Sequence, residues 1–194
     1  MVVKVGTAVL TSPTGQLDTE RVRHLVHQVH ELWGRGIQSV VVTSGAISAG
    51  WHELGFESRP TAMPQLQASA AVGQGKLISI YDEYLHKLGR HAGQLLLTRE
   101  DFENRKRYLN ARNTIWALLD RGSIPIINEN DTISVEEITF GDNDILSAQV
   151  THLVQAEVLI ILSTVDGLYR GQPAPGQKPQ VVQEVESVSE AVKT

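Results

Sequence analysis

The stretch Ser123-Ile-Pro-Ile-Ile-Asn-Glu-Asn-Asp131 places a polar cluster directly after an apolar run. The run 123–127 predicts a buried strand that ends where the cluster 128–131 begins. Acidic and amide side chains are poor core material, because burying them without a partner is costly. They are well suited to binding a small polar ligand and magnesium-bound phosphates. This stretch therefore predicts a strand whose end carries a ligand site.

A second polar cluster, Gly141-Asp-Asn-Asp144, directly precedes the run 145–150, which predicts the start of a helix. Any one of its three polar side chains could merely cap that helix. A single cap explains one residue of three, however, and leaves 128–131 unexplained. Two oxygen-rich loops could instead orient an amino group, an attacking carboxylate and magnesium, and we favour this functional interpretation.

Outward from these clusters, short β-branched runs alternate with helical patterns. Asp18 offers a helix start, and apolar residues then repeat at helical spacing up to Gly34. Strands that alternate with helices predict an α/β fold, a mainly parallel sheet with helices on both sides. The predicted strands are Val2–Gly6, Ile37–Thr43, Gln94–Thr98, Ser123–Asn128 and Glu157–Ser163.

A second helical region runs from Pro64 to about Leu88, and Gly73 and Gly75 within it predict a bend or a close backbone approach. The sequence Thr98-Arg-Glu-Asp101 resembles a capping box and predicts the start of a further helix. The predicted inner face of 64–88 consists of Ala68, Ala71, Val72, Leu77, Ile80, Tyr84 and Leu88.

Composition is that of an ordinary globular chain of 194 residues with a net charge of −5. The absence of cysteine excludes disulfides and thiolate metal sites. The acidic balance argues against nucleic acid as a partner, and no apolar stretch approaches the length of a membrane span. With no basic leader ahead of the first strand, we expect a cytoplasmic protein.

In open parallel sheets, ligands bind beyond the carboxyl ends of the strands. Polar segments follow the predicted strands at such ends. We therefore expect every polar group of interest to lie on one rim of the sheet. The segments are Lys4–Thr7, Thr43–Ala46, Asn128–Asp131 and Ser163–Thr164.

Lys4 lies within an apolar strand, followed by Gly6 and Thr7. It could be a strand-edge lysine with its ammonium in water. It could also belong to a phosphate clamp, in which glycine admits an anion to the backbone amides and the ammonium neutralises charge. The segment Thr43–Ala46 could be a tight strand-to-helix turn or a helix N-terminus that binds an anion. Since no complete phosphate-binding fingerprint is present, the tight turn is favoured for Thr43–Ala46 taken alone, while both interpretations of Lys4 remain open.

His24, His27 and His30 do not have the spacing of a metal site. At helical periodicity they spread around the face opposite the apolar one, so we expect them in solvent. Trp33 and Trp116 fall at apolar helix positions, and we expect both in the core rather than in a stacking platform.

Several segments together carry a resemblance to a known family. They are Val-Val-Lys-Val-Gly-Thr-Ala-Val (2–9), Val-Val-Thr-Ser-Gly-Ala-Ile (41–47), Leu-Leu-Thr-Arg-Glu-Asp (96–101), Tyr-Leu-Asn-Ala-Arg-Asn-Thr (108–114), Pro-Ile-Ile-Asn-Glu-Asn-Asp-Thr (125–132), Phe-Gly-Asp-Asn-Asp (140–144) and Asp-Gly-Leu-Tyr (166–169). From Val2 to about Tyr169 the chain resembles the glutamate 5-kinase family of the amino acid kinase superfamily. The resemblance implies a three-layer αβα sandwich and ATP-dependent phosphorylation of the γ-carboxylate of L-glutamate, with Mg²⁺, at the start of proline biosynthesis.

Carried over by position, the resemblance assigns Lys4 to the transferring phosphoryl group and Asp144 to the arrangement of the reacting groups. Both would be catalytic. The carboxylate of the substrate is already a nucleophile at neutral pH, so positioning and charge neutralisation matter more than a general base. The residues that would hold glutamate are Ser44, Asn128, Asp131 and Asn143.

For the nucleotide, the resemblance implies that Gly6 and Gly45 offer backbone amides to the phosphoryl group, beside Lys4. Ser163 and Thr164 match the nucleotide-contacting pair that follows the Leu-Ile-Ile-Leu strand. The family usually has Asp at the second position of this pair, so Thr164 departs from the pattern.

The family's kinase domain continues past Thr194 into a glycine-rich nucleotide loop with a second catalytic lysine, and some members add a PUA domain. We therefore expect 1–194 to be a single kinase domain that is incomplete at its C-terminus, lacks a PUA domain and has little or no activity alone. The resemblance also implies a homo-oligomer, and proline as a possible feedback inhibitor.

Two other functions fit the same residues. Another member of the superfamily could act on carbamate, acetylglutamate, aspartate or UMP, and the clusters around Ser44, 128–131 and 141–144 would distinguish it. A catalytically silent fragment could sense glutamate or proline. A dinucleotide-binding oxidoreductase is disfavoured because the glycine fingerprint is missing.

Overall fold

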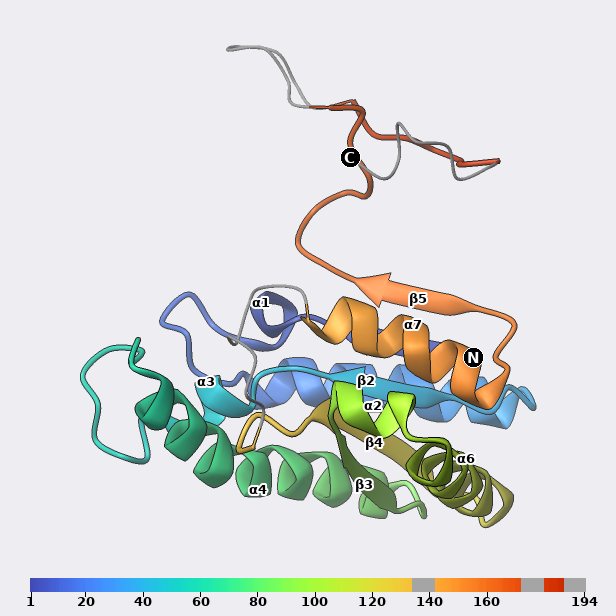
Figure 1. Cartoon of the computed structure of the whole chain (residues 1–194), viewed down its shortest axis with the longest axis horizontal. Helices are drawn as coiled ribbons and strands as arrows, with labels where there is room; N and C mark the ends of the chain where they lie inside the picture. The colour runs from blue at the N-terminus through green and yellow to red at the C-terminus, as the bar shows by residue number, and fades with distance from the viewer. Residues whose placement is uncertain (134–141, 172–179, 187–194) are drawn as a thin grey trace. The chain divides into compact units, whose positions relative to one another are not determined.

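The computed structural model describes residues 1–133, 142–171 and 180–186. The chain forms two compact units, Met1–Leu162 and Ser163–Thr194. The first unit contains the sheet and the helices that cover it (Figure 1). It is described first, because it holds most of the residues that the sequence predicts to be functional.

The first unit is built on a parallel sheet in the order β3-β4-β2-β1-β5, which confirms the α/β prediction. Because β1, β2 and β4 lie side by side at its centre, the segments that follow them meet at one rim. All five predicted strands are present, with ends that differ by a few residues. They are β1 (Val2–Val5), β2 (Val40–Thr43), β3 (Ala92–Leu97), β4 (Ile124–Glu129) and β5 (Leu159–Leu162).

Helices connect the strands and begin where the sequence supplies caps. The Asp18 carboxylate accepts hydrogen bonds from the amides of Glu20 and Arg21, and the capping box of Thr98 and Asp101 is confirmed. The helices are α1 (Thr7–Leu10), α2 (Thr19–Gly34), α3 (Ala46–Gly50), α4 (Met63–Lys87), α5 (Arg99–Glu103), α6 (Arg105–Asp120) and α7 (Asp142–Val154).

The two faces of the sheet are covered by different helices, which makes the three layers. Alternate side chains of each strand point to opposite faces, so each face has its own apolar cluster. The first cluster joins Val3, Val5, Val41, Ile124 and Ile126 of the sheet to Val22, Leu25, Val26 and Val29 of α2 and Leu77, Tyr81 and Leu85 of α4. The second joins Val2, Val40, Val42, Leu95, Leu97 and Ile127 to Ile115 of α6 and Leu146, Val150 and Leu153 of α7.

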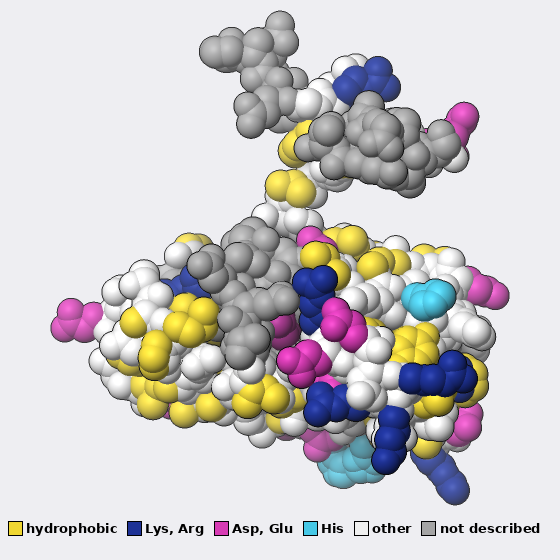
Figure 2. Space-filling view, in the orientation of Figure 1, with side chains coloured by type: hydrophobic (Ala, Val, Ile, Leu, Met, Phe, Trp, Pro, Cys, Tyr) yellow, Lys and Arg dark blue, Asp and Glu magenta, His cyan; other side chains and the backbone are white. Residues whose placement is uncertain are grey.

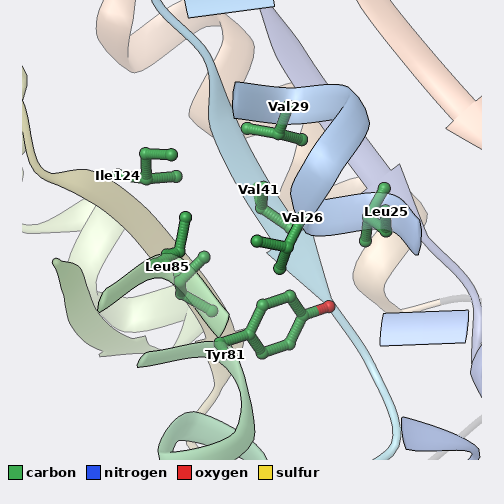
Figure 3. Close-up of a pocket in the computed structure, with 8 residues that line it drawn as sticks. Leu25, Val26, Val29, Val41, Tyr81, Leu85 and Ile124 are labelled. Carbon is green, nitrogen blue, oxygen red and sulfur yellow. The ribbon is translucent and has the colours of Figure 1, made fainter. Parts of the chain in front are cut away.

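Figure 3 shows part of the first cluster, where α2, α4 and the sheet converge on the Tyr81 ring. The space among these side chains is too small to hold a water molecule, so it is core and not a ligand pocket. The Tyr81 side chain is fully buried, and its hydroxyl therefore needs a polar partner.

The predicted inner face of α4 is wrong in its first half, where Ala68, Ala71 and Val72 are exposed. It is confirmed in its second half, where Leu77 is buried and Ile80, Tyr84 and Leu88 are partly buried against the first cluster. Val72 is 42% exposed, whereas Gly73 and Gln74 are buried. The buried stripe follows one helical face through Leu66, Ser69, Ala70, Gly73, Gln74, Leu77, Tyr81 and Leu85. The predicted close approach does occur: a Cβ on Gly73 would lie 1.8 Å from the carbonyl oxygen of Ala46 in α3. Helix α4 passes through Gly73 and Gly75 without a break.

One further apolar prediction differs from the structure. Trp116 is 40% exposed rather than in the core, while Trp33 is partly buried against the first cluster. Ile160 and Ile161 of β5 are exposed because β5 is an edge strand, whereas β1 and β2 are buried throughout. On the surface, Lys and Arg are interspersed with Asp and Glu on the face that Figure 2 shows. None of the helices in the described ranges could cross a membrane.

The second unit contains an antiparallel bridge between Tyr169 and Val181. It is supported by hydrogen bonds from the Arg170 amide to the Gln180 carbonyl, 2.9 Å, and from the Val182 amide to the Leu168 carbonyl, 2.7 Å. Ser163 and Thr164 open this unit, directly after β5.

Candidate active site

Lys4 is buried and ion-paired at the centre of the sheet. It lies in β1, opposite Val42 of β2 and Ile161 of β5, and only 8% of its surface is exposed. Its Nζ lies 2.5 Å from Oδ1 of Asp144, which is in the first turn of α7. The Asp144 side chain is half exposed. The interpretation of Lys4 as a surface lysine with its ammonium in water is therefore wrong. The ammonium is instead held in place by the Asp144 carboxylate.

Two glycines border this ion pair and the neighbouring turn. A Cβ on Gly6 would lie 3.5 Å from the Lys4 ammonium, so a side chain there would fill the space beside the charge. The Gly6 amide donates to the Leu162 carbonyl at 3.2 Å, so the donor predicted for a phosphoryl group is already in use in this structure. Gly45 precedes α3 with a φ of 102°, a left-handed conformation that favours glycine.

Three side chains from distant segments form an amide network at the carboxyl rim. The two hydrogens of Asn143 Nδ2 are shared among three acceptors, the Thr43 carbonyl at 3.2 Å, Ser44 Oγ at 2.7 Å and Asn128 Oδ1 at 3.2 Å. Asn128 is 2% exposed and Ser44 is 8% exposed, so the network is shielded from bulk water. The predicted meeting of the strand ends with the start of α7 therefore occurs for these residues.

The hydrogen-bonding capacity left in this network points to a polar ligand. Asn143 Oδ1 is buried and has no partner among the residues that the structure describes. The Ser44 hydroxyl accepts from Asn143, so its own hydrogen remains able to donate. A buried acceptor without a donor is costly in a folded protein unless a ligand or a water supplies the donor.

The buried Tyr81 is hydrogen-bonded to the turn that follows β2. The Thr43 hydroxyl donates to the Ser44 carbonyl at 3.2 Å, so the Tyr81 hydroxyl, 3.0 Å away, donates to Thr43 Oγ1. Burial raises the pKa of the Tyr81 phenol to about 12, while its hydrogen bond with Thr43 acts in the opposite direction. Tyr81 is therefore a neutral structural donor at physiological pH.

The remaining predicted residues are placed as follows. Asp131 lies two residues beyond β4 and is half buried. Ser163 and Thr164 belong to the second unit, where Ser163 Oγ accepts from the Val165 amide at 3.4 Å. Gly141 of the second polar cluster lies outside the described residues.

Sequence reasoning missed Gln74. It is buried in α4, and its Oε1 accepts a hydrogen bond from Asn128 Nδ2 at 2.8 Å. The predicted inner face of α4 consisted of apolar residues and did not include it. The spacing of Leu66, Ala70, Leu77, Tyr81 and Leu85 would have found the correct stripe.

The three histidines of α2 differ in exposure. His24 and His27 are exposed as predicted, and the partly buried His30 accepts a hydrogen bond from Arg90 Nε at 3.3 Å. Within the described part of the chain, no group of three or more His, Cys, Asp or Glu could hold a metal ion.

Comparison with known proteins shows the family of the chain. The model of the amino acid kinase family matches residues 1–193. The chain is 47% identical over 193 residues to a glutamate 5-kinase of Clostridium acetobutylicum, covering 100% of this chain and 72% of that protein. It is 49% identical over 190 residues to a glutamate 5-kinase of Caldanaerobacter subterraneus subsp. tengcongensis, covering 98% of this chain and 51% of that protein.

Among solved structures, the fold is similar to that of a UMP kinase from Bacillus anthracis, with a TM-score of 0.58. That match covers 93% of this chain and 71% of the other, at 14% identity, and so supports the fold alone. The chain spans about half the length of most of the curated relatives that it matches. The family model nevertheless covers nearly the whole chain, and the chain belongs to the amino acid kinase family, where these relatives are glutamate 5-kinases.

Proposed function

We propose that this site binds L-glutamate and transfers the γ-phosphoryl group of ATP to its γ-carboxylate, giving L-glutamyl 5-phosphate, the first step of proline biosynthesis. The names of the relatives support the reaction. The ion pair of Lys4 and Asp144, beside the amide network at the same rim, supports its location.

The proposal that the substrate is an amino acid rests on the unused hydrogen-bonding groups around Asn143. Its buried Oδ1 can accept a hydrogen bond from a ligand, and the neighbouring Ser44 hydroxyl can donate one. The α-ammonium and carboxylate of an amino acid supply these two groups side by side. Ser44 and Asn143 are therefore our proposed glutamate contacts, and we propose Asn128 and Asp131 with them from the family resemblance.

The phosphoryl group is proposed to bind beside Lys4. The ammonium is held in a largely buried position, and the missing side chain of Gly6 leaves space next to it. A fixed positive charge at this point neutralises the charge that develops on the transferring group. Lys4 and Asp144 are then the catalytic residues, and Gly6 and Gly45 keep the backbone open to the anion.

The proposed reaction also requires sites for the nucleotide and for Mg²⁺. Mg²⁺, which neutralises the phosphates of ATP when bound, needs only one or two protein carboxylates, so no resident cage is required. We propose Ser163 and Thr164 as nucleotide contacts, together with Lys4, Gly6 and Gly45.

In the proposed reaction a γ-carboxylate oxygen of glutamate forms a bond to the γ-phosphorus of ATP while the bond from that phosphorus to the β-phosphate oxygen breaks, and ADP leaves. A carboxylate is ionised at neutral pH, so no proton has to be removed. The residues of the site orient the two reactants and neutralise charge.

Binding and turnover are tested separately. Calorimetric titration of the chain with L-glutamate is expected to show a single site, and Asn143→Leu is expected to abolish it. Because the 194-residue chain is expected to have little or no activity alone, turnover is measured on the full-length protein, where trapping with hydroxylamine in the presence of ATP, Mg²⁺ and L-glutamate reports the acyl phosphate. A hydroxamate formed from another acid but not from glutamate would reassign the substrate, and binding without any hydroxamate would favour a silent sensor.

With this activity we propose the setting of a biosynthetic enzyme, cytoplasmic and self-associating, with proline as a feedback inhibitor. Analytical ultracentrifugation and glutamate titrations repeated with proline present test the last two properties.

A further inference from the structure

Gln74 is a buried polar residue that no motif explains. It lies in the middle of α4, it is 8% exposed, and its Oε1 accepts from Asn128 Nδ2 at 2.8 Å. A buried amide in an otherwise apolar stripe is costly unless it is hydrogen-bonded. Its neighbour Gly73 lies against the α3 backbone, so this part of α4 is held close to the turn that carries Ser44.

Backbone groups fix the direction of the amides that follow Gln74. The Glu129 amide donates to Asn128 Oδ1 at 2.9 Å, so the Asn128 NH₂ must point the other way, towards Gln74. At the next step, the Thr43 carbonyl accepts from Asn143 Nδ2, so Asn143 Oδ1 points away from the network. A backbone N–H can only donate and a backbone carbonyl can only accept, so each assignment has one solution.

We infer that Gln74 is a positioning residue that locks Asn128 in this orientation, so that Asn143 presents an acceptor, and Ser44 a donor, to the ligand. This inference rests on the proposed function and deepens it. The polarity of the site then selects a zwitterion, with an ammonium beside a carboxylate, over a dicarboxylate of the same length that lacks the amino group.

Removal of the Gln74 acceptor has a definite consequence. The Asn128 NH₂ is left buried without a partner, and the side chain gains by turning to find one. Turning withdraws Asn128 Oδ1 from Asn143, which then loses one of its three acceptors. Asn143 is then held with Oδ1 towards the ligand only by its bonds to the Thr43 carbonyl and Ser44 Oγ, so its position is less fixed and the affinity for the ammonium falls more than the affinity for the carboxylates.

The experiment titrates the chain calorimetrically with L-glutamate and with glutarate, which has both carboxylates and no ammonium. Gln74→Met removes the acceptor at similar volume and is expected to weaken L-glutamate binding by about tenfold to a hundredfold. Glutarate binding is expected to weaken less, so the preference for L-glutamate over glutarate falls. Gln74→Glu keeps an acceptor at Oε1 and is expected to restore the preference.

Gln65→Met, an exposed position of the same helix, is the matched control and is expected to bind both ligands as the wild type does. Unfolding curves show whether each variant folds. If Gln74→Met lacks a cooperative transition, Gln74→Asn, whose acceptor is withdrawn by one methylene, is measured in its place.

The outcomes separate the two proposals. If the wild type binds L-glutamate and the Gln74 variants keep its full preference, the role of Gln74 is refuted and the proposed function stands. Equal losses for both ligands would also overturn the inference, because they indicate general damage to the site. If the wild type does not bind L-glutamate at all, both proposals fail.

Discussion

Asn143 Nδ2 donates a hydrogen bond of 2.7 Å to Ser44 Oγ, although the two residues are 99 positions apart in the chain. The contact joins the first turn of α7 to the turn after β2. Because Asn143 also reaches Asn128, three segments meet at one rim of the sheet. The geometry of the site therefore depends on how α7 and α4 pack on the two faces of the sheet.

Ser44→Ala is expected to weaken L-glutamate binding by about 1 to 3 kcal/mol, because Asn143 loses its shortest acceptor and the ligand loses a donor. Calorimetric titration measures the effect. Ser79→Ala is the control, since the exposed Ser79 hydroxyl bonds only to the Gly75 carbonyl of its own helix among the hydrogen bonds seen here. A wild-type affinity in Ser44→Ala would remove Ser44 from the binding site.

Lys4→Met is expected to slow phosphoryl transfer by about a thousandfold, since one charge at close range contributes about 4 kcal/mol at an intermediate effective dielectric. The hydroxamate assay on the full-length protein gives the rate. Lys76→Met removes a lysine whose ion pair with Glu53 is half exposed and lies outside the site, and its rate is expected to stay at the wild-type value. Equal rates in the two variants would argue that the Lys4 ammonium has no catalytic role.

Gly73→Ala and Gly75→Ala are expected to change stability in opposite directions. A Cβ at Gly73 would lie 1.8 Å from the Ala46 carbonyl oxygen and 2.5 Å from the Gly50 nitrogen, both backbone atoms that cannot turn aside. We expect a loss of about 2 to 4 kcal/mol in the free energy of unfolding. Gly75 faces open space within the same helix, and alanine there should add about 0.5 to 1 kcal/mol. Urea denaturation measures both, and a stable Gly73→Ala protein would mean that α3 and α4 are not in close contact.

Tyr81→Phe is expected to reduce the alkaline sensitivity of the fold. The pKa of the Tyr81 phenol is raised to about 12 in the folded state from 10.0, so between these values the unfolded chain loses the proton first. Stability from this group is therefore complete below pH 10 and declines as pH rises towards 12. Urea unfolding at pH 9 to 11.5 should show a shallower decline for Tyr81→Phe, together with a constant loss of about 1 kcal/mol from the missing hydrogen bond to Thr43. Parallel curves for the two proteins would contradict the raised pKa.

Local signals predicted the elements well, and long-range packing explains the failures. The hydrogen bonds of the cap at Asp18 and of the capping box at Thr98 join residues only two or three positions apart, so the local sequence is enough to predict them. The face of α4 depends on what lies across from it. Gly73 and Gln74 are buried because α3 and Asn128 meet them there, and neither partner is near in sequence.

By itself the sequence determined the parallel α/β architecture and the polar residues at the ends of its central strands, which we propose to bind a small acid. Period-two and helical apolar patterns fix these features because each element must bury one side. Only the tertiary structure decided that Lys4 is paired with Asp144, that Asn143 keeps an unpartnered acceptor, and that Gln74 supports Asn128. Hydrogen bonds and ion pairs between distant segments depend on positions to within a fraction of an ångström, and those positions come from the packing of the helices on the sheet.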